Sequence, residues 1–241
     1  LQRGHSVTVF EQKDTIGGQF TLAAMIPGKA DYGRSIQYWH NQLKKLGGVL
    51  VLGEKILSLD RLAAFDHVVI ATGVMPRQPK MEGIDLPHVY FYDDFLKKGI
   101  QPKEKIVIIG AGGIGVDMAC YVTGKDSHKD SSAKDFFKHW NIDPKVRGGL
   151  LAEKKTPSAI KVTLMQRSDG GLGKGLGKTT GWIHRLELKK QGVKFLNNLD
   201  YNRITVTGVE VKLKSGEVKN VEADQVIICA GQESVADLVP L

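Results

Sequence analysis

A glycine-rich turn near the middle of the chain has the residue types and spacing of a phosphate-binding loop. Gly110, Gly112 and Gly115 fit the pattern G-x-G-x-x-G, with Gly113 between the last two. The pattern follows the apolar run 106–109, typical of a strand buried on both faces, and precedes a helix-like stretch. The first glycine permits a tight turn, the second admits a pyrophosphate, and the third allows close helix–strand packing. Because a helix N-terminus also attracts phosphates, the sequence predicts a dinucleotide site at these four glycines.

The choice between the two nicotinamide dinucleotides depends on the end of the next predicted strand, 162–165. NAD sites carry an acidic residue there, which hydrogen-bonds the ribose 2′-hydroxyl. Here the strand is followed by Gln166 and Arg167. A guanidinium pairs well with a 2′-phosphate, so Arg167 favours NADP, although a solvated surface charge explains the same residue. The separation from Gly115 exceeds the usual ~20 residues, and a predicted insertion at 123–160 accounts for the excess.

A second glycine-dense loop, 170–177, leads toward a predicted helix. It does not fit the P-loop pattern, because Leu172 stands where that pattern requires glycine. Lys178 is a candidate for lining the cofactor phosphate as the loop passes over it, and a flexible surface loop explains the sequence equally well. On the helix that follows, Trp182 is interpreted as a core residue and His184 as a packing or surface residue.

A second set of candidate residues lies near the start of the chain. Glu11 ends a short β-branched run and is placed to hydrogen-bond the adenosine ribose of another dinucleotide. Gly17, Gly18 and Gln19 then form a tight turn suited to close ligand approach. The glycine fingerprint that accompanies such an acidic residue lies ~20 residues upstream, which falls before Leu1. We therefore expect the chain to begin inside a domain.

Two predicted strand ends resemble each other. Ala71, Thr72 and Gly73 follow one short apolar run, and Ala230 and Gly231 follow another. This duplication predicts two related nucleotide-binding modules, one inserted in the other, with these five residues close to the cofactors. One flavin site and one nicotinamide site is the economical assignment.

The elements that position these residues alternate between strands and helices. Apolar or β-branched runs predict strands at 7–10, 49–52, 68–70, 106–109, 162–165, 193–196 and 225–229. Helical spacing predicts helices at 31–46, 113–122 and 179–191. Three short alternating strands near 203–221 predict an antiparallel excursion. The pattern as a whole predicts an α/β, Rossmann-like fold with a central parallel sheet.

The same pattern divides the chain by cofactor. We expect a partial FAD-binding domain at 1–103, an NADP-binding domain at 104–235 and the start of a return to the FAD domain at 236–241. The NADP module is then inserted in the partial FAD module. Within it, the charged and weakly periodic segment 123–160 is interpreted as a solvated surface excursion without chemistry.

Composition limits the remaining classes of function. The chain has 241 residues, 41% of them hydrophobic, and a formal net charge of +8. Its basic residues are spread out and no aromatic-rich RNA motif accompanies them, so anionic nucleotides are favoured over nucleic acid. No apolar run reaches the ~18 residues of a membrane helix, and no Cys/His spacing indicates a metal site. Cys120 and Cys229 are interpreted as buried, reduced thiols of a cytoplasmic protein.

Together these segments resemble the flavoproteins with two dinucleotide-binding domains, most closely the C-terminal half of the bacterial NADPH-dependent 2,4-dienoyl-CoA reductases. The resemblance spans essentially the whole chain. It is carried by residues 7–20, 26–29, 71–77, 106–115 and 175–185. The last of these segments, Gly-Leu-Gly-Lys-Thr-Thr-Gly-Trp-Ile-His-Arg, is long and specific.

The resemblance implies an oxidoreductase that binds FAD and NADPH in this half and passes hydride from NADPH to FAD. It further implies a TIM barrel with FMN and a 4Fe–4S cluster, outside this chain, where 2,4-dienoyl-CoA from unsaturated fatty acids is reduced. This chain is then the electron-input part, and it is not expected to reduce dienoyl-CoA alone. Two alternatives stay open: a subunit that feeds electrons to a separate partner, and a nucleotide-binding domain without turnover. No catalytic residue is assigned, because the cofactors themselves carry the hydride chemistry.

Overall fold

The chain divides into two compact units. A computed structural model describes residues 1–124, 132–145, 148–152, 157–171, 173 and 175–239. The first unit comprises Leu1–Met25, Lys29–Met75 and Gln232–Leu241, and the second comprises Ile26–Gly28 and Pro76–Gly231. Parts of the predicted insertion, position 172 and the end of the predicted return at 236–241 lie outside the described residues. The division of the chain by cofactor stays a prediction.

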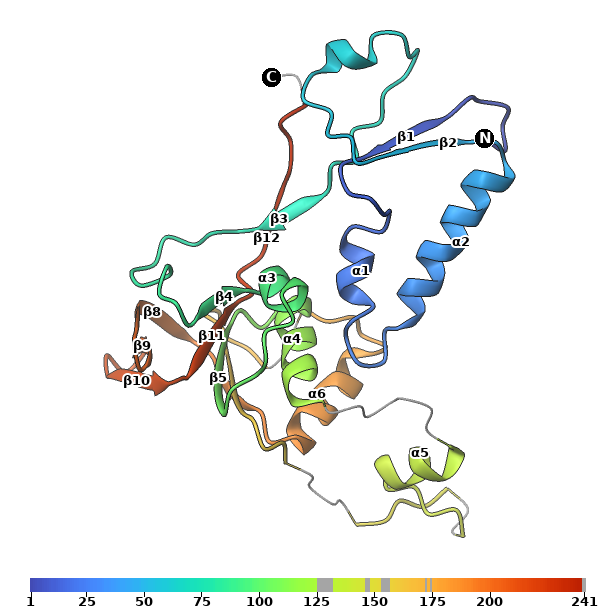
Figure 1. Cartoon of the computed structure of the whole chain (residues 1–241). Coiled ribbons are helices and arrows are strands. Elements are labelled where there is room, and N and C mark those ends of the chain that lie inside the picture. The colour runs from blue at the N-terminus through green and yellow to red at the C-terminus, as the bar shows by residue number, and fades with distance from the viewer. Residues whose placement is uncertain (125–131, 146–147, 153–156, 172, 174, 240–241) are drawn as a thin grey trace. The chain divides into compact units, whose positions relative to one another are not determined.

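The first unit contains a small parallel sheet and an amphipathic helix (Figure 1). Strand β1 (Thr8–Glu11) pairs in parallel with β2 (Val49–Leu52), as predicted. The short helix α1 (Gln19–Ala23) and 3₁₀ turn η1 (Leu59–Leu62) were not predicted. Helix α2 (Asp31–Lys45) confirms the prediction for 31–46, with an acid in its first turn and lysines in its last. Strands β3 (Val74–Pro76) and β12 (Gln232–Ser234) form a second two-stranded sheet.

The strand predicted at 68–70 is wrong. These residues form no strand, and the side chain of Val69 is 87% exposed. An apolar run becomes a strand only where other strands hydrogen-bond its backbone. Among the described strands of this unit, β1 pairs with β2 and β3 pairs with β12, and none pairs with 68–70.

The second unit is built on a five-stranded parallel sheet. Its strands, in the order β4-β11-β5-β6-β7, are Val89–Phe91, Gln225–Ile228, Lys105–Ile109, Lys161–Met165 and Lys194–Leu196. All four pairings are parallel. Burial removes the central side chains from water, with Val107, Ile108 and Val226 all at 0% exposure. The predicted α/β fold with a central parallel sheet is therefore confirmed.

Helices and a second sheet complete this unit (Figure 1). The helices are α3 (Tyr92–Lys97), α4 (Gly113–Thr123), α5 (Ala133–His139) and α6 (Gly181–Lys190). Strands β8 (Leu199–Thr205), β9 (Gly208–Leu213) and β10 (Val218–Glu222) form the predicted antiparallel excursion. Its Val209 and Val211 share one buried cluster with Val107, Ile109 and Met165 of the parallel sheet. The excursion thus closes part of the core.

The insertion contains a helix that the sequence did not predict. Ser132 and Asp135 cap the start of α5 reciprocally, and these hydrogen bonds lower the pKa of the Asp135 carboxyl. His139 at its end lies 2.9 Å from Glu187 on α6, and the Lys190 ammonium donates to the His139 carbonyl at 2.8 Å. The described part of the insertion is therefore fastened to α6 as well as exposed to solvent.

The two cysteines are free, but their burial differs. Cys229 is buried and Cys120 is half-buried, so the prediction of two buried thiols is wrong for Cys120. Its neighbour Ala119 on α4 is fully buried, and the helix turns about 100° per residue, which carries Cys120 away from the core. Across the described residues, no helix is both long and apolar enough to cross a membrane.

Candidate functional site

The turn between β5 and α4 needs glycine at its first and last positions because backbone atoms approach closely. Gly110 has φ +108, and a Cβ there would lie 2.3 Å from the Cys229 carbonyl oxygen. A Cβ on Gly115 would lie 1.8 Å from the Gly110 carbonyl oxygen. The Gly110 N–H donates to the Met165 carbonyl at 2.8 Å, which ties the turn to β6. The two glycines therefore shape the turn itself.

The middle of the same turn is open. A Cβ on Gly112 or Gly113 would meet no heavy atom within 4 Å, and both residues are exposed. Gly112 caps α4 without a side-chain hydrogen bond, and the first N–H groups of a helix have no acceptor within that helix. Donors and open space at a positive helix end are what a pyrophosphate requires. The residues present therefore fit the phosphates of a dinucleotide.

Ala230 and Gly231 lie beside this turn. The Cys229 N–H just before them donates to the Ile109 carbonyl at 2.8 Å. A Cβ on Gly110 would come within 3.3 Å of the Ala230 nitrogen. Gly231 has φ +109, and its carbonyl accepts the Arg77 N–H at 3.0 Å. The structure thus gathers six predicted site residues at the carboxyl end of the sheet: Gly110, Gly112, Gly113, Gly115, Ala230 and Gly231.

Arg167 follows β6 at the same end of the sheet. It is exposed, and within the described chain its guanidinium makes no hydrogen bond or ion pair. Side-chain amides hold the loop beyond it: Gln166 donates to the Gly170 carbonyl at 3.3 Å, and Asn197 donates to the same oxygen at 2.7 Å. Sequence reasoning missed the role of Asn197, although an Asn-Asn pair after a strand is a turn signal. These two hydrogen bonds hold the Gly170 backbone, and the exposed Arg167 keeps its donors available.

Lys178 is exposed in the turn before α6, and no contact between described residues joins it to the Gly112 turn. The turn is braced by Trp182, whose indole N–H donates to the Thr179 carbonyl at 3.0 Å. Trp182 is 55% exposed, so its prediction as a core residue is wrong. It lies in the first turn of α6, where its ring is exposed to solvent. His184 is half-buried, in agreement with a packing residue.

In the first unit, Glu11 ends β1 as predicted. One carboxylate oxygen, Oε1, accepts the Lys13 N–H at 2.9 Å, and the Glu11 carbonyl accepts the Glu54 N–H at 3.1 Å. Among the described residues, the other carboxylate oxygen accepts no hydrogen bond. The carboxylate is therefore oriented by its own turn, and the described residues leave its second oxygen available to a donor.

The predicted Gly17 turn lies against the segment that follows 68–70. Gly17 has φ +131, and a Cβ there would lie 2.6 Å from Thr21 Oγ1, while Gly18 has φ +50 and open space around it. The Gln19 side chain donates to the Val74 carbonyl at 3.3 Å. This contact brings the turn to the neighbourhood of Ala71, Thr72 and Gly73.

Val235, near the C-terminus, hydrogen-bonds to the segment 72–73. Thr72 Oγ1 donates to the Val235 carbonyl at 2.5 Å, and the Val235 N–H donates to the Gly73 carbonyl at 3.0 Å. Ala71 is exposed beside them. The structure thus joins the Gln19 side chain to Val74, the residue after Gly73, and it places Glu11 at the end of β1.

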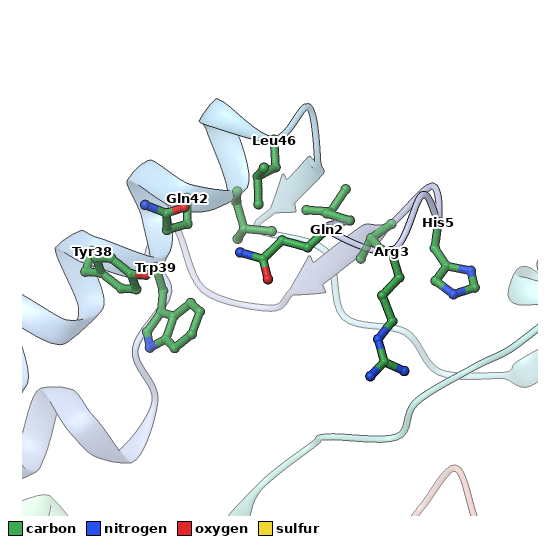
Figure 2. Close-up of a pocket in the computed structure, with 10 residues that line it drawn as sticks. Gln2, Arg3, His5, Tyr38, Trp39, Gln42 and Leu46 are labelled. Atoms are coloured by element: carbon green, nitrogen blue, oxygen red, sulfur yellow. The ribbon is translucent and has the colours of Figure 1, made fainter.

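A separate hollow of 590 Å³ lies in the first unit. Figure 2 shows Tyr38, Trp39 and Gln42 of α2 on one side of it and Arg3 and His5 of the N-terminal segment on the other. None of the predicted cofactor residues line this hollow. It is distinct from the Glu11 and Gly17 positions.

Comparison with known proteins identifies the family. The sequence pattern of the pyridine nucleotide-disulphide oxidoreductases matches residues 1–239. The chain belongs to this family. Membership makes it an oxidoreductase domain with FAD and NAD(P)H as its cofactors. The open Gly112 turn of the second unit and the oriented Glu11 of the first fit two such nucleotides.

Individual known proteins are similar to this chain over nearly its whole length. A metal reductase of Desulforamulus reducens is 30% identical over 98% of the chain, which covers 35% of that protein. A structure of 2-naphthoyl-CoA reductase with 2-naphthoyl-CoA has 28% identity and a TM-score of 0.77, covering 98% of the chain and 31% of the structure. A histamine dehydrogenase from Rhizobium sp. 4-9, at 20% identity and a TM-score of 0.69, shares the fold. The chain therefore spans about a third of these relatives.

Proposed function

We propose that this chain is the electron-input part of an NADPH-dependent flavin oxidoreductase. The observation that carries the proposal is the open turn at Gly112 and Gly113, with Arg167 after the next strand of the same sheet, exposed and without a hydrogen bond or ion pair to any described residue. The helix end supplies a place for the pyrophosphate that NADP shares with NAD. Arg167 supplies a partner for the 2′-phosphate that NAD lacks.

The second unit holds NADP through its backbone and two cations. The N–H groups at the start of α4 bind the pyrophosphate, while Gly110 and Gly115 hold the turn that presents them. Arg167 pairs with the 2′-phosphate, and Lys178 adds a positive charge as its loop passes the cofactor. Ala230 and Gly231 line the end of the sheet without side chains that would obstruct the nucleotide.

The first unit holds FAD. The free oxygen of Glu11 accepts a ribose hydroxyl, and Gly17 and Gly18 let the backbone approach the ligand. Gln19, which donates to the Val74 carbonyl, and the preceding segment Ala71–Gly73 lie beside the flavin nucleotide.

The cofactors supply the redox chemistry, in which a hydride passes from the nicotinamide to the flavin. The residues of this chain bind and orient the two nucleotides and keep their phosphates paired with N–H groups and cations. No side chain is required to move a proton, so none is assigned as a general acid or base.

We place this activity in a longer flavoprotein of the 2,4-dienoyl-CoA reductase type, in the cytoplasm. The support is the set of segments that resemble that family, together with the coverage of about a third of longer relatives. In that protein a TIM-barrel domain with FMN and a 4Fe–4S cluster receives the electrons and reduces the dienoyl-CoA. The longer polypeptide should then oxidise NADPH in the presence of 2,4-dienoyl-CoA. Absence of that activity in the enzyme with its cofactors bound would exclude 2,4-dienoyl-CoA as the substrate.

Calorimetric titration of the chain with NADPH and NADH tests the core of the proposal. Arg167→Asp should weaken NADPH binding at least 10-fold more than NADH binding, because a charge pair of about 1.5–3 kcal/mol is replaced by repulsion. Gly112→Val should abolish binding of both, since its side chain fills the pyrophosphate space. Lys212→Asp, the same charge change at an exposed position of β9, is the control. Equal losses of NADPH and NADH for Arg167→Asp would contradict the 2′-phosphate role.

Electron transfer is tested separately. With FAD added, the chain should reduce ferricyanide at the expense of NADPH, and Gly112→Val should not. Binding of NADPH without any turnover in the FAD-loaded chain would instead indicate a nucleotide-binding domain without catalysis.

A further inference from the structure

A buried hydroxyl group near Arg167 has no hydrogen-bond partner. Tyr201 lies in β8, and its hydroxyl oxygen is inaccessible to solvent with no partner among the described residues. Leaving a hydroxyl unpaired in this way is unfavourable, and buried polar groups in folded proteins are nearly always paired. A group of this kind calls for an explanation in function or in a partner gained on binding.

The position of Tyr201 connects it with the predicted cofactor edge. Its ring packs against the core cluster that includes Met165, the last residue of β6, and Leu199, the first residue of β8. Arg167 follows Met165 by two residues. Burial raises the pKa of the Tyr201 phenol, while the positive charge of Arg167 acts in the opposite direction. The hydroxyl therefore stays protonated and lies within electrostatic reach of the guanidinium.

The two groups are complementary in their hydrogen-bonding capacity. A guanidinium has five N–H donors and no acceptor, and a phenol oxygen can accept. One edge of the guanidinium can grip a phosphate through two N–H groups while another N–H donates to the phenol oxygen. A guanidinium without such a second anchor loses more side-chain entropy when it binds.

We propose that Tyr201 is a positioning residue for Arg167, whose guanidinium it anchors through its hydroxyl when the 2′-phosphate of the dinucleotide binds. This inference rests on the proposed function and deepens it, because it names a second residue that determines the preference for the phosphorylated cofactor. Tyr201 acts through Arg167 and does not touch the reacting atoms.

Tyr201→Phe is a sharp test, because it removes only an unpartnered hydroxyl. The melting temperature of the cofactor-free variant should equal or exceed that of the parent. Its affinity for NADPH should fall about 10-fold or more, the effect of losing one hydrogen bond to a charged group, and its affinity for NADH should change less than 2-fold. Tyr90→Phe on β4 is the control, with no change in either affinity.

A double variant separates positioning from direct contact. In an Arg167→Ala background, Tyr201→Phe should have no further effect on NADPH affinity, since the hydroxyl then has no guanidinium to anchor. Equal losses for NADPH and NADH, a fall in melting temperature, or additive losses in the double variant would overturn the inference.

The failure of this inference is distinguishable from failure of the proposed function. A parent that prefers NADPH and a Tyr201→Phe variant with the same preference would overturn the role of Tyr201 and leave the proposed function intact. A parent that binds neither nucleotide, or binds both equally, would overturn the NADP assignment and this inference with it.

Discussion

The runs 68–70 and 226–229 have nearly the same apolar sequence. The first is followed by Ala-Thr-Gly and the second by Ala-Gly. In the second unit Val226 and Ile227 are at 0% exposure, because β11 lies between β4 and β5. In the first unit Val69 is 87% exposed and its segment forms no strand. The difference shows that a short apolar run acquires strand structure from neighbours that hydrogen-bond it and cover its faces.

The turns that follow the two runs are nevertheless alike. Gly73 has φ +81 and Gly231 has φ +109, both in the region that side chains rarely adopt. Each turn also receives a backbone partner from a distant segment, Val235 for Gly73 and Arg77 for Gly231. Both turns thus combine a glycine conformation with a hydrogen bond from a distant segment, whereas only the second run forms a strand.

The largest contrast is expected for one substitution made in both runs. Val226→Ala should lower the free energy of unfolding of the second unit by about 2 kcal/mol, from lost burial and a residual cavity. Val69→Ala should change the stability of its unit by less than ~0.5 kcal/mol, because the side chain is already exposed. Urea unfolding in a Trp39→Phe background leaves Trp140 and Trp182 as reporters of the second unit. The unfolding of Val69→Ala is monitored by circular dichroism. A loss of unfolding free energy comparable to that of Val226→Ala would mean that 68–70 is buried in solution.

A smaller and equal effect is expected at the two glycines. Gly73→Ala and Gly231→Ala should each cost about 1 kcal/mol, since both force a side chain into positive φ. Steric room is sufficient at both positions: a Cβ on Gly73 would meet nothing within 4 Å, and one on Gly231 would lie 3.4 Å from an Arg77 nitrogen. Gly33→Ala in α2, where φ is helical and the space is open, should be stabilising instead. A much larger loss at Gly231 would show that crowding outweighs conformation there.

The smallest effect is expected from an ion pair beside β11. Lys105 opens β5, and its ammonium lies 2.6 Å from Glu222, which lowers the pKa of the Glu222 carboxyl and raises that of Lys105. A lowered folded-state pKa stabilises the fold above the unfolded pKa, and this contribution is lost as pH falls through the folded value. Glu222→Gln should therefore lower the urea midpoint slightly at about pH 7 and not at about pH 3.

The exposed Glu217 provides the matched control for this ion pair. Glu217→Gln should leave the midpoint unchanged at both pH values, because that carboxyl lies in the turn between β9 and β10 and forms no ion pair among the described residues. A pH-independent loss for Glu222→Gln would assign its effect to packing rather than to charge.

Much of the second unit could be predicted from the sequence, because its signals are local and strong. The run 106–109 and the glycine spacing that follows it predict a buried strand, a tight turn and a helix, and all three are present. The sequence did not predict β4 and α3, whose residues 89–97 are short and lack a repeated period. It also missed α5, whose cap is a capping box but whose few apolar residues show no helical stripe.

Within the candidate site, residue types were predictable and contacts were not. The glycines, Glu11 and Arg167 stand at strand ends that any parallel sheet brings to its carboxyl edge. The carbonyl that accepts both Gln166 and Asn197, and the unpartnered hydroxyl of Tyr201, depend on segments about 30 residues apart in the chain. No local pattern reports such a meeting.

The sequence by itself indicated where this chain turns and which turns are candidates for binding phosphate, because glycine permits positive φ and a close approach of the backbone. It also determined the alternation of strands and helices in the second unit. Only the tertiary structure decided which apolar runs became strands and which polar groups remain unpaired among the described residues. It also decided which glycines are required because an added Cβ would lie less than 2.5 Å from a carbonyl oxygen. These outcomes depend on atoms supplied by distant residues, so they become defined only when the core has packed.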